Sequence, residues 1–220
     1  MNQPLINAFM PSKGILAKAK RMLPGAAATT LLWLLAATCG EPGVIEAAFP
    51  LLFLPLISIT SFLMARNRAG SLLDKRGAKT AVRTLGNTAV AVAAESIPFV
   101  VLFSDWSLNW SPFAIGVLLA VAIGGLAGTV TELLFPGENV QAACLAAFLQ
   151  APSITGLALI RHPSLLLLPN QGPLDMLDGA FGPLWGVDLM LPLLAGSAWI
   201  GLGVYAAVAA LRKTPSARKL

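Results

Sequence analysis

Six apolar stretches, most of them about 20 residues long, limit what this chain can fold into. They lie at about 25–40, 45–65, 87–104, 112–135, 140–160 and 187–211. A helix that rises about 1.5 Å per residue needs about 20 residues to cross about 30 Å of hydrocarbon. Only 11% of the residues are charged, and the mean hydropathy is +0.77. We therefore expect an all-α integral membrane protein with about six transmembrane helices.

The segment before the first stretch, residues 1–24, mixes apolar side chains with four basic ones. This pattern is typical of an amphipathic helix that lies on the inner membrane surface. A secretory signal peptide, with Cys39 as a lipoprotein-type start, is the competing interpretation. The length and amphipathic character of the basic part disfavour it. The expected organisation is an interfacial segment at 1–24, a six-span domain at 25–211 and a basic tail at 212–220.

Basic residues are unevenly distributed and predict the orientation of the chain. Four lie in the N-terminal segment, six lie between Arg66 and Arg83, and four lie in the tail. The positive-inside rule therefore places both termini and the segment 66–86 in the cytoplasm, with the spans in the plasma membrane. The net charge of +5 then marks cytoplasmic flanks beside anionic lipid, which disfavours a nucleic-acid partner.

Signatures of enzymes and metal sites are absent from the sequence. Cys39 and Cys144 fall in different apolar stretches without a nearby CxxC or Cys/His cluster, and His162 stands alone beside Pro163. No HExxH, GxSxG or GxxxxGK[ST] motif occurs. We expect no catalytic residue, metal site or cofactor on this chain.

The segment 66–86 alternates apolar and charged residues, which suits a short cytoplasmic helix exposed on one side. Gly70 and Ser71 offer that helix a start. One interpretation is an ordinary loop whose charges hold the neighbouring spans in place. The other is a docking element for a cytoplasmic protein.

The order of these elements resembles that of an ABC-2 type transporter permease over nearly the whole chain. The resemblance rests on the amphipathic N-terminal segment, a two-span unit, a basic segment with an Arg-x-Gly-Ser start at Arg68, and four further spans. It implies that the segment 66–86 contains a coupling helix, which docks on a separate ABC ATP-binding subunit. The implied coupling residues are Arg66, Arg68, Gly70, Ser71, Leu72, Leu73, Asp74, Lys75, Arg76, Lys79 and Arg83.

The same resemblance has consequences for partners and for the last outer loop. ATP and Mg²⁺ would bind to the partner subunit, and the chain would work beside a second copy or a related permease. The family places short re-entrant helices in the outer loop, here 161–187, and the pieces 164–168 and 174–181 suit that role. An extracellular cap packed on the bundle is the alternative.

Polar and small residues inside the stretches are further candidates. Glu95, beside Ser96, lies near the centre of the third stretch, where a charge costs about 2.5–3.5 kcal/mol on insertion scales. It is either a substrate contact or proton site, or a protonated residue that fixes packing. Glu132 near the inner end of the fourth stretch suits an interfacial position. Gly124 and Gly128 allow two helices of the chain to approach closely.

The leading functional expectation is a permease subunit of an ATP-driven exporter with a hydrophobic or amphipathic cargo. Three rivals remain open. The chain could be the substrate-binding membrane subunit of an energy-coupling importer, an ion-coupled carrier that uses Glu95, or an assembly subunit that transports nothing.

Overall fold

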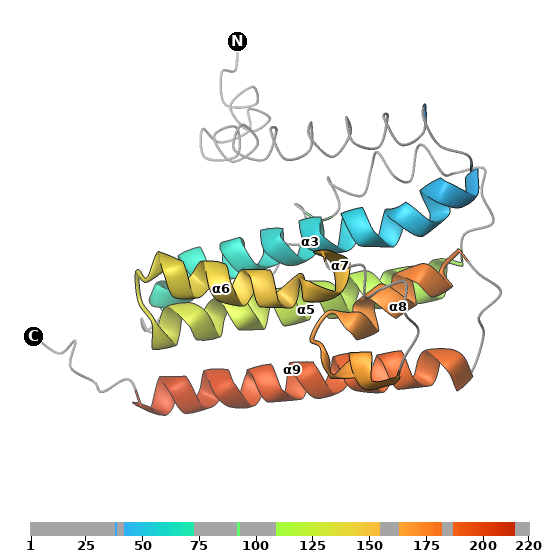
Figure 1. Ribbon diagram of the computed structural model, residues 1–220. Helices are drawn as coiled ribbons and strands as arrows, with labels where there is room; N and C mark the ends of the chain where they lie inside the picture. The colour runs from blue at the N-terminus through green and yellow to red at the C-terminus, as the bar shows by residue number, and fades with distance from the viewer. Residues whose placement is uncertain are drawn as a thin grey trace, which may run out of the picture.

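A computed structural model describes residues 38, 42–72, 92, 109–154, 163–181 and 187–213. The regular structure in these residues is entirely helical and contains no strand, which confirms the predicted all-α class for this part of the chain (Figure 1). The elements are α3 (Pro42–Leu72), α5 (Trp110–Leu134), α6 (Asn139–Leu149), α7 (Ala151–Ile154), the 3₁₀ helix η2 (Pro163–Leu167), α8 (Gln171–Gly179) and α9 (Val187–Lys213).

Three of the described helices are long and apolar enough to cross a membrane. Their apolar segments are Pro50–Ala69 in α3, Trp110–Leu134 in α5 and Leu189–Arg212 in α9. They correspond to the stretches expected at 45–65, 112–135 and 187–211. The stretches expected at 25–40 and 87–104 lie outside the described residues, apart from the helical Thr38 and Val92, and so does the segment 1–24.

The stretch expected as one span at 140–160 has a different structure where it is described. α6 has 11 residues, which is about 16 Å of helix, and it ends at Gln150 before the four-residue helix α7. Pro152 has no N–H group to continue the hydrogen bonding of α6. The helix therefore breaks about halfway across the thickness that a single span would need.

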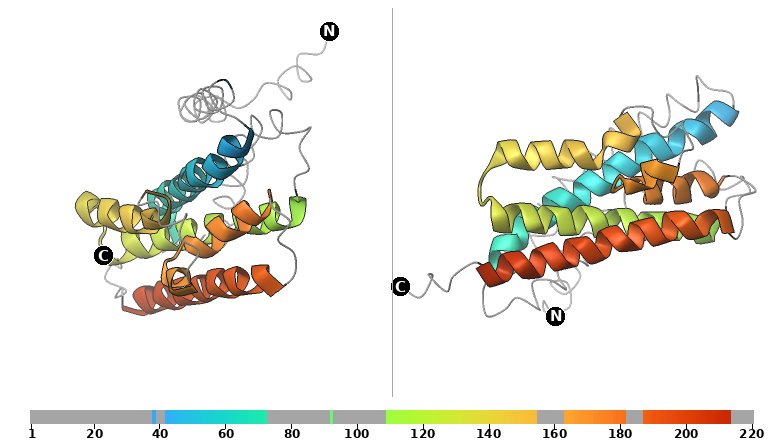
Figure 2. Two further views of the ribbon diagram at one scale, coloured as in Figure 1. Left: turned by 45° about the vertical axis from the view of Figure 1, so that its right-hand side comes forward. Right: turned by 60° about the horizontal axis from the view of Figure 1, so that its bottom comes forward.

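α3, α5 and α9 run in the same direction, and α6 returns beside α5 (Figures 1 and 2). α5 lies between the other two long helices and contacts both. α8 fills the space between α3, α5 and α9 at one end of the bundle, and most of its residues are buried. The core at this end contains Phe53, Ile57 and Leu177, and Phe53 stacks on Phe113 with 5.9 Å between ring centroids.

The seam between α3 and α5 has a regular register. Gly124 faces Ser58, and Gly128 faces Phe62, four residues further along each helix. A Cβ atom on Gly124 would lie 2.5 Å from the carbonyl oxygen of Ser58, and one on Gly128 would clash with the backbone at Phe62. The close helix approach predicted from these glycines is found here, within one chain.

Short helices occupy part of the predicted outer loop 161–187. η2 covers most of the expected piece 164–168, and α8 overlaps the expected piece 174–181 but begins three residues earlier. Asn170, just before α8, donates from Nδ2 to the Ser58 hydroxyl at 2.9 Å and so ties this loop to α3.

Candidate functional site

The end of α3 contains the first part of the predicted coupling segment. Arg66 and Arg68 lie within the last two turns, and the helix continues without a break to Leu72. The sequence predicts that Gly70 and Ser71 start a separate helix, but both belong to α3, and the residues after Leu72 lie outside the described part of the chain. No proline follows Pro55 in this helix, and a glycine near a helix end costs at most about 1 kcal/mol, so the sequence does not stop it there.

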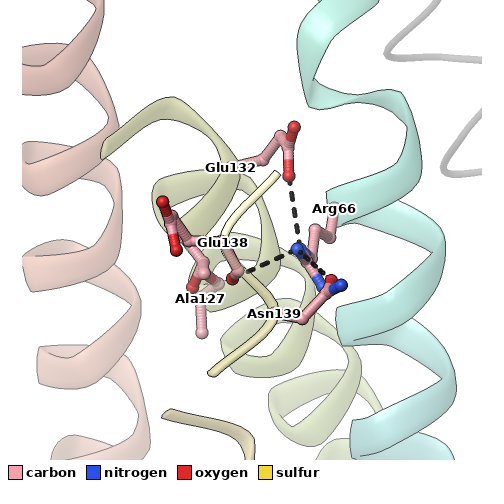
Figure 3. Close-up of polar contacts among 6 residues, drawn as sticks. Arg66, Ala127, Glu132, Glu138 and Asn139 are labelled. Carbon is pink, nitrogen blue, oxygen red and sulfur yellow. Dashed lines mark hydrogen bonds and ion pairs between the residues drawn. The ribbon is translucent and has the colours of Figure 1, made fainter. Parts of the chain in front are cut away.

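Arg66 joins three elements at this end of the bundle (Figure 3). Its Nε donates to the Glu132 carboxylate on α5 at 3.2 Å. Its Nη2 donates to the backbone carbonyl of Glu138 at 3.3 Å and to Oδ1 of Asn139, the first residue of α6, at 3.0 Å. One guanidinium group thus holds α3 to the end of α5 and to the start of α6.

The turn between α5 and α6 presents these acceptors. It contains Pro136 and Gly137, and Gly137 has a φ of +77°, which a residue with a side chain rarely adopts. The chain reverses there within four residues, because α5 ends at Leu134 and α6 begins at Asn139. After the reversal, the Glu138 carbonyl and the Glu132 carboxylate both face Arg66 (Figure 3).

The ion pair is partly shielded from solvent. The side chains of Arg66 and Glu132 are 15% and 24% exposed. An arginine offers its donors in a fixed planar fork, so several acceptors can hold it in one orientation. The arrangement therefore links α3 to α5 and α6.

An open apolar groove of about 470 Å³ lies on the surface between α5 and α6 near this link. Its lining residues are Val130, Thr131, Leu134, Phe135, Val140, Gln141, Cys144, Leu145 and Phe148. The Thr131 hydroxyl donates its hydrogen to the Ala127 carbonyl at 2.7 Å and is left only as an acceptor. The groove suits a hydrocarbon group and offers it little polar recognition.

The structure brings together only part of the predicted site. Arg66 pairs with Glu132, which the sequence indicated merely as an interfacial residue. The remaining candidates lie outside the described residues: Leu73, Asp74, Lys75, Arg76, Lys79, Arg83, Glu95 and Ser96. The sequence places two opposite charges, Arg66 and Glu132, at the ends of two spans that are expected to share one side of the membrane. This could have suggested the ion pair. Which residue of one helix faces which residue of the other is known only from the packed helices.

Within the described part of the chain, no group of three or more His, Cys, Asp or Glu residues is placed to hold a metal ion. No protein-family model matches the chain, and no curated protein and no solved structure matches it.

Proposed function

We propose that this chain is the membrane subunit of an ATP-driven transporter of the ABC-2 type, and that it exports a hydrophobic or amphipathic substrate. The observation that supports the proposal best is the link made by Arg66. It ties the helix that leads into the basic segment 66–86 to both α5 and α6.

A force applied to the basic segment has a direct route into the bundle. α3 is one continuous helix of 31 residues, so its cytoplasmic end and its apolar part move together. The seam at Gly124 and Gly128 leaves no room between α3 and α5 for independent sliding. Arg66 extends the connection to α6. Transport further requires that the bundle have two arrangements which ATP binding and release favour in turn.

In this proposal the partner supplies the chemistry. A separate ABC ATP-binding subunit binds ATP and Mg²⁺, closes on a second ATPase, and pulls on the segment 66–86. A second copy of this chain, or a related permease, completes the pathway. The chain itself contributes helices, the docking segment and the contact surface for the cargo in the plasma membrane.

Copurification with a matched charge variant tests the proposal. The chain is purified from its native membrane in mild detergent, and accompanying proteins are identified by mass spectrometry. One variant changes Lys75, Arg76, Lys79 and Arg83 to Ser. The control changes Arg212, Lys213, Arg218 and Lys219 to Ser, which removes the same charge from the other cytoplasmic cluster.

We expect an ABC ATPase to accompany the wild type and the tail variant and to be lost from the loop variant. Recovery of an intact chain without any nucleotide-binding protein would overturn the proposal. Retention of the ATPase by the loop variant would move the docking surface elsewhere.

The rival functions give different results. A subunit of an energy-coupling importer would bind a vitamin-like ligand tightly without other subunits. An ion-coupled carrier would lose transport in Glu95→Gln while its abundance in the membrane stayed unchanged. An assembly subunit would show no flux of any cargo, and substitutions in its spans would change only complex formation.

A further inference from the structure

Three carboxamide side chains are almost completely buried around α7 and α8. The exposed fractions are 2% for Gln150, 0% for Asn170 and 3% for Gln171. Buried polar groups in proteins are nearly always hydrogen-bonded, because an unpaired one keeps the full cost of losing water. Several atoms of these three side chains nevertheless have no hydrogen-bond partner among the described residues.

The unpaired atoms at the start of α8 are oxygens. Asn170 donates from Nδ2 to the Ser58 hydroxyl at 2.9 Å, and Gln171 donates from Nε2 to the Asp175 carboxylate at 2.7 Å. Rotating the Gln171 amide would set two oxygens against each other, so the carboxylate fixes its orientation. Oδ1 of Asn170 and Oε1 of Gln171 are left as free acceptors.

The end of α6 adds more unpaired groups. Both amide atoms of Gln150 and the hydroxyl of Ser153 have no partner in the described structure. These residues flank the break between α6 and α7, and α7 contacts both α3 and α8. Asn170 also bonds Ser58, so α3, α7 and the start of α8 contact one another. Broken helices inside membrane bundles commonly border binding sites.

The chemistry of the junction selects a class of ligand. The free oxygens of Asn170 and Gln171 repel an anion. The positive end of the α8 dipole lies at the same residues and partly offsets the Asp175 carboxylate, which Gln171 already binds. A hydroxyl group can donate to these oxygens and can also accept from Nε2 of Gln150. An uncharged ligand with several hydroxyl groups therefore satisfies the junction best.

We propose that the junction of α3, α7 and α8 binds an uncharged, hydroxyl-rich group, such as the sugar of a glycolipid or a free sugar. As a cargo contact, the site rests on the proposed transport function. The binding itself does not, and it is measured on the purified chain alone. Failure of this site would leave the copurification result unaffected.

The test uses the full chain in phosphatidylcholine nanodiscs and follows its thermal unfolding. One probe is monoglucosyl diacylglycerol in the bilayer, and its control is diacylglycerol. The other probe is methyl glucoside in the buffer, and its control is buffer alone. We expect one probe to raise the melting temperature by about 2 °C or more at saturation. A shift with the lipid alone identifies a lipid head group, and a shift with the glucoside identifies a free sugar.

Variants locate the response. Gln150→Leu removes two unpaired polar atoms, so we expect it to unfold at the same or a higher temperature than the wild type and to lose the shift. Gln141→Leu makes the same change on the exposed face of α6 and should keep the shift. If Gln150→Leu fails to fold, Ser153→Ala replaces it and should weaken the shift.

Two results would overturn the proposal. One is the absence of any shift with both probes in a folded wild-type chain. The other is a shift in melting temperature that is as large in Gln150→Leu as in Gln141→Leu. Where Ser153→Ala is used instead, the equivalent result is a shift as large as in the wild type.

Discussion

At the residue scale, Arg66 has two roles, and only one of them could be predicted from the sequence. It belongs to the basic cluster that predicts orientation, and it also holds α5 and α6 through three hydrogen bonds. The partner residues lie 66 to 73 positions further along the chain. A single sequence indicates which ends of the spans share a side of the membrane. It does not give the register that pairs one residue with another.

We predict that the Arg66–Glu132 pair contributes about 1–2 kcal/mol to the free energy of unfolding. This value lies between the contributions of exposed and buried ion pairs, as the partial burial of both side chains requires. The measurement is a double-mutant cycle with Arg66→Gln, Glu132→Gln and the double variant, each unfolded in detergent micelles.

Arg212→Gln, at an exposed position on α9, serves as the control and should couple to Glu132→Gln by less than about 0.3 kcal/mol. A coupling energy that small for Arg66 and Glu132 would contradict the link described here.

At the scale of elements, the positions of three long helices followed from the apolar stretches, since a run of about 20 apolar residues is sufficient to predict a span. α3 extends beyond its stretch at both ends. The interruptions were harder to predict. Gly70 and Ser71 resemble the start of a helix but are helical residues of α3, whose described part ends at Leu72. Gln150 and Pro152 lie within an apolar stretch but end α6. In both cases the helix propensity of single residues predicts the helix ends less well than packing does.

We predict that Gly128→Ala separates α3 from α5 and lowers stability by about 1–3 kcal/mol. The added Cβ meets the backbone at Phe62, which cannot turn aside as a side chain could. Gly201→Ala is the control, because no atom lies within 4 Å of a Cβ at that position of α9. We expect it to be neutral or slightly stabilising. Equal melting temperatures for the two variants would contradict the tight seam.

At the scale of the whole molecule, the charge map and the helix directions agree. α3, α5 and α9 end on the same side of the bundle (Figure 1), and their ends carry Arg66, Glu132 and Arg212. The sequence predicted these three directions from the basic clusters together with the number of spans expected between them, since the turn after α5 has no basic residue. The number of spans was less predictable, because the stretch at 140–160 contains a helix too short to cross and the stretches at 25–40 and 87–104 lie almost wholly outside the described residues.

We predict that the ends of these helices react with thiol reagents from opposite sides of the membrane. Single cysteines replace Asn139, Arg212 or Trp110 in a chain whose Cys39 and Cys144 are Ser. A membrane-impermeant maleimide applied outside intact cells should label only the Trp110→Cys variant. Asn139→Cys and Arg212→Cys should react in inverted vesicles. Labelling of these two from opposite sides would contradict the parallel arrangement of α5 and α9.

The parallel course of α3 and α5 also bears on how the chain is synthesised. Two helices that enter the bilayer in the same direction cannot insert together as a hairpin. α3 leaves the translocon first and remains without its neighbour until Gly124 and Gly128 have been translated. During that interval Arg66 has no Glu132 to bind. In the orientation that the basic residues predict, its charge keeps the end of α3 at the cytoplasmic surface. The same arginine orients the nascent helix and later ties the finished bundle together.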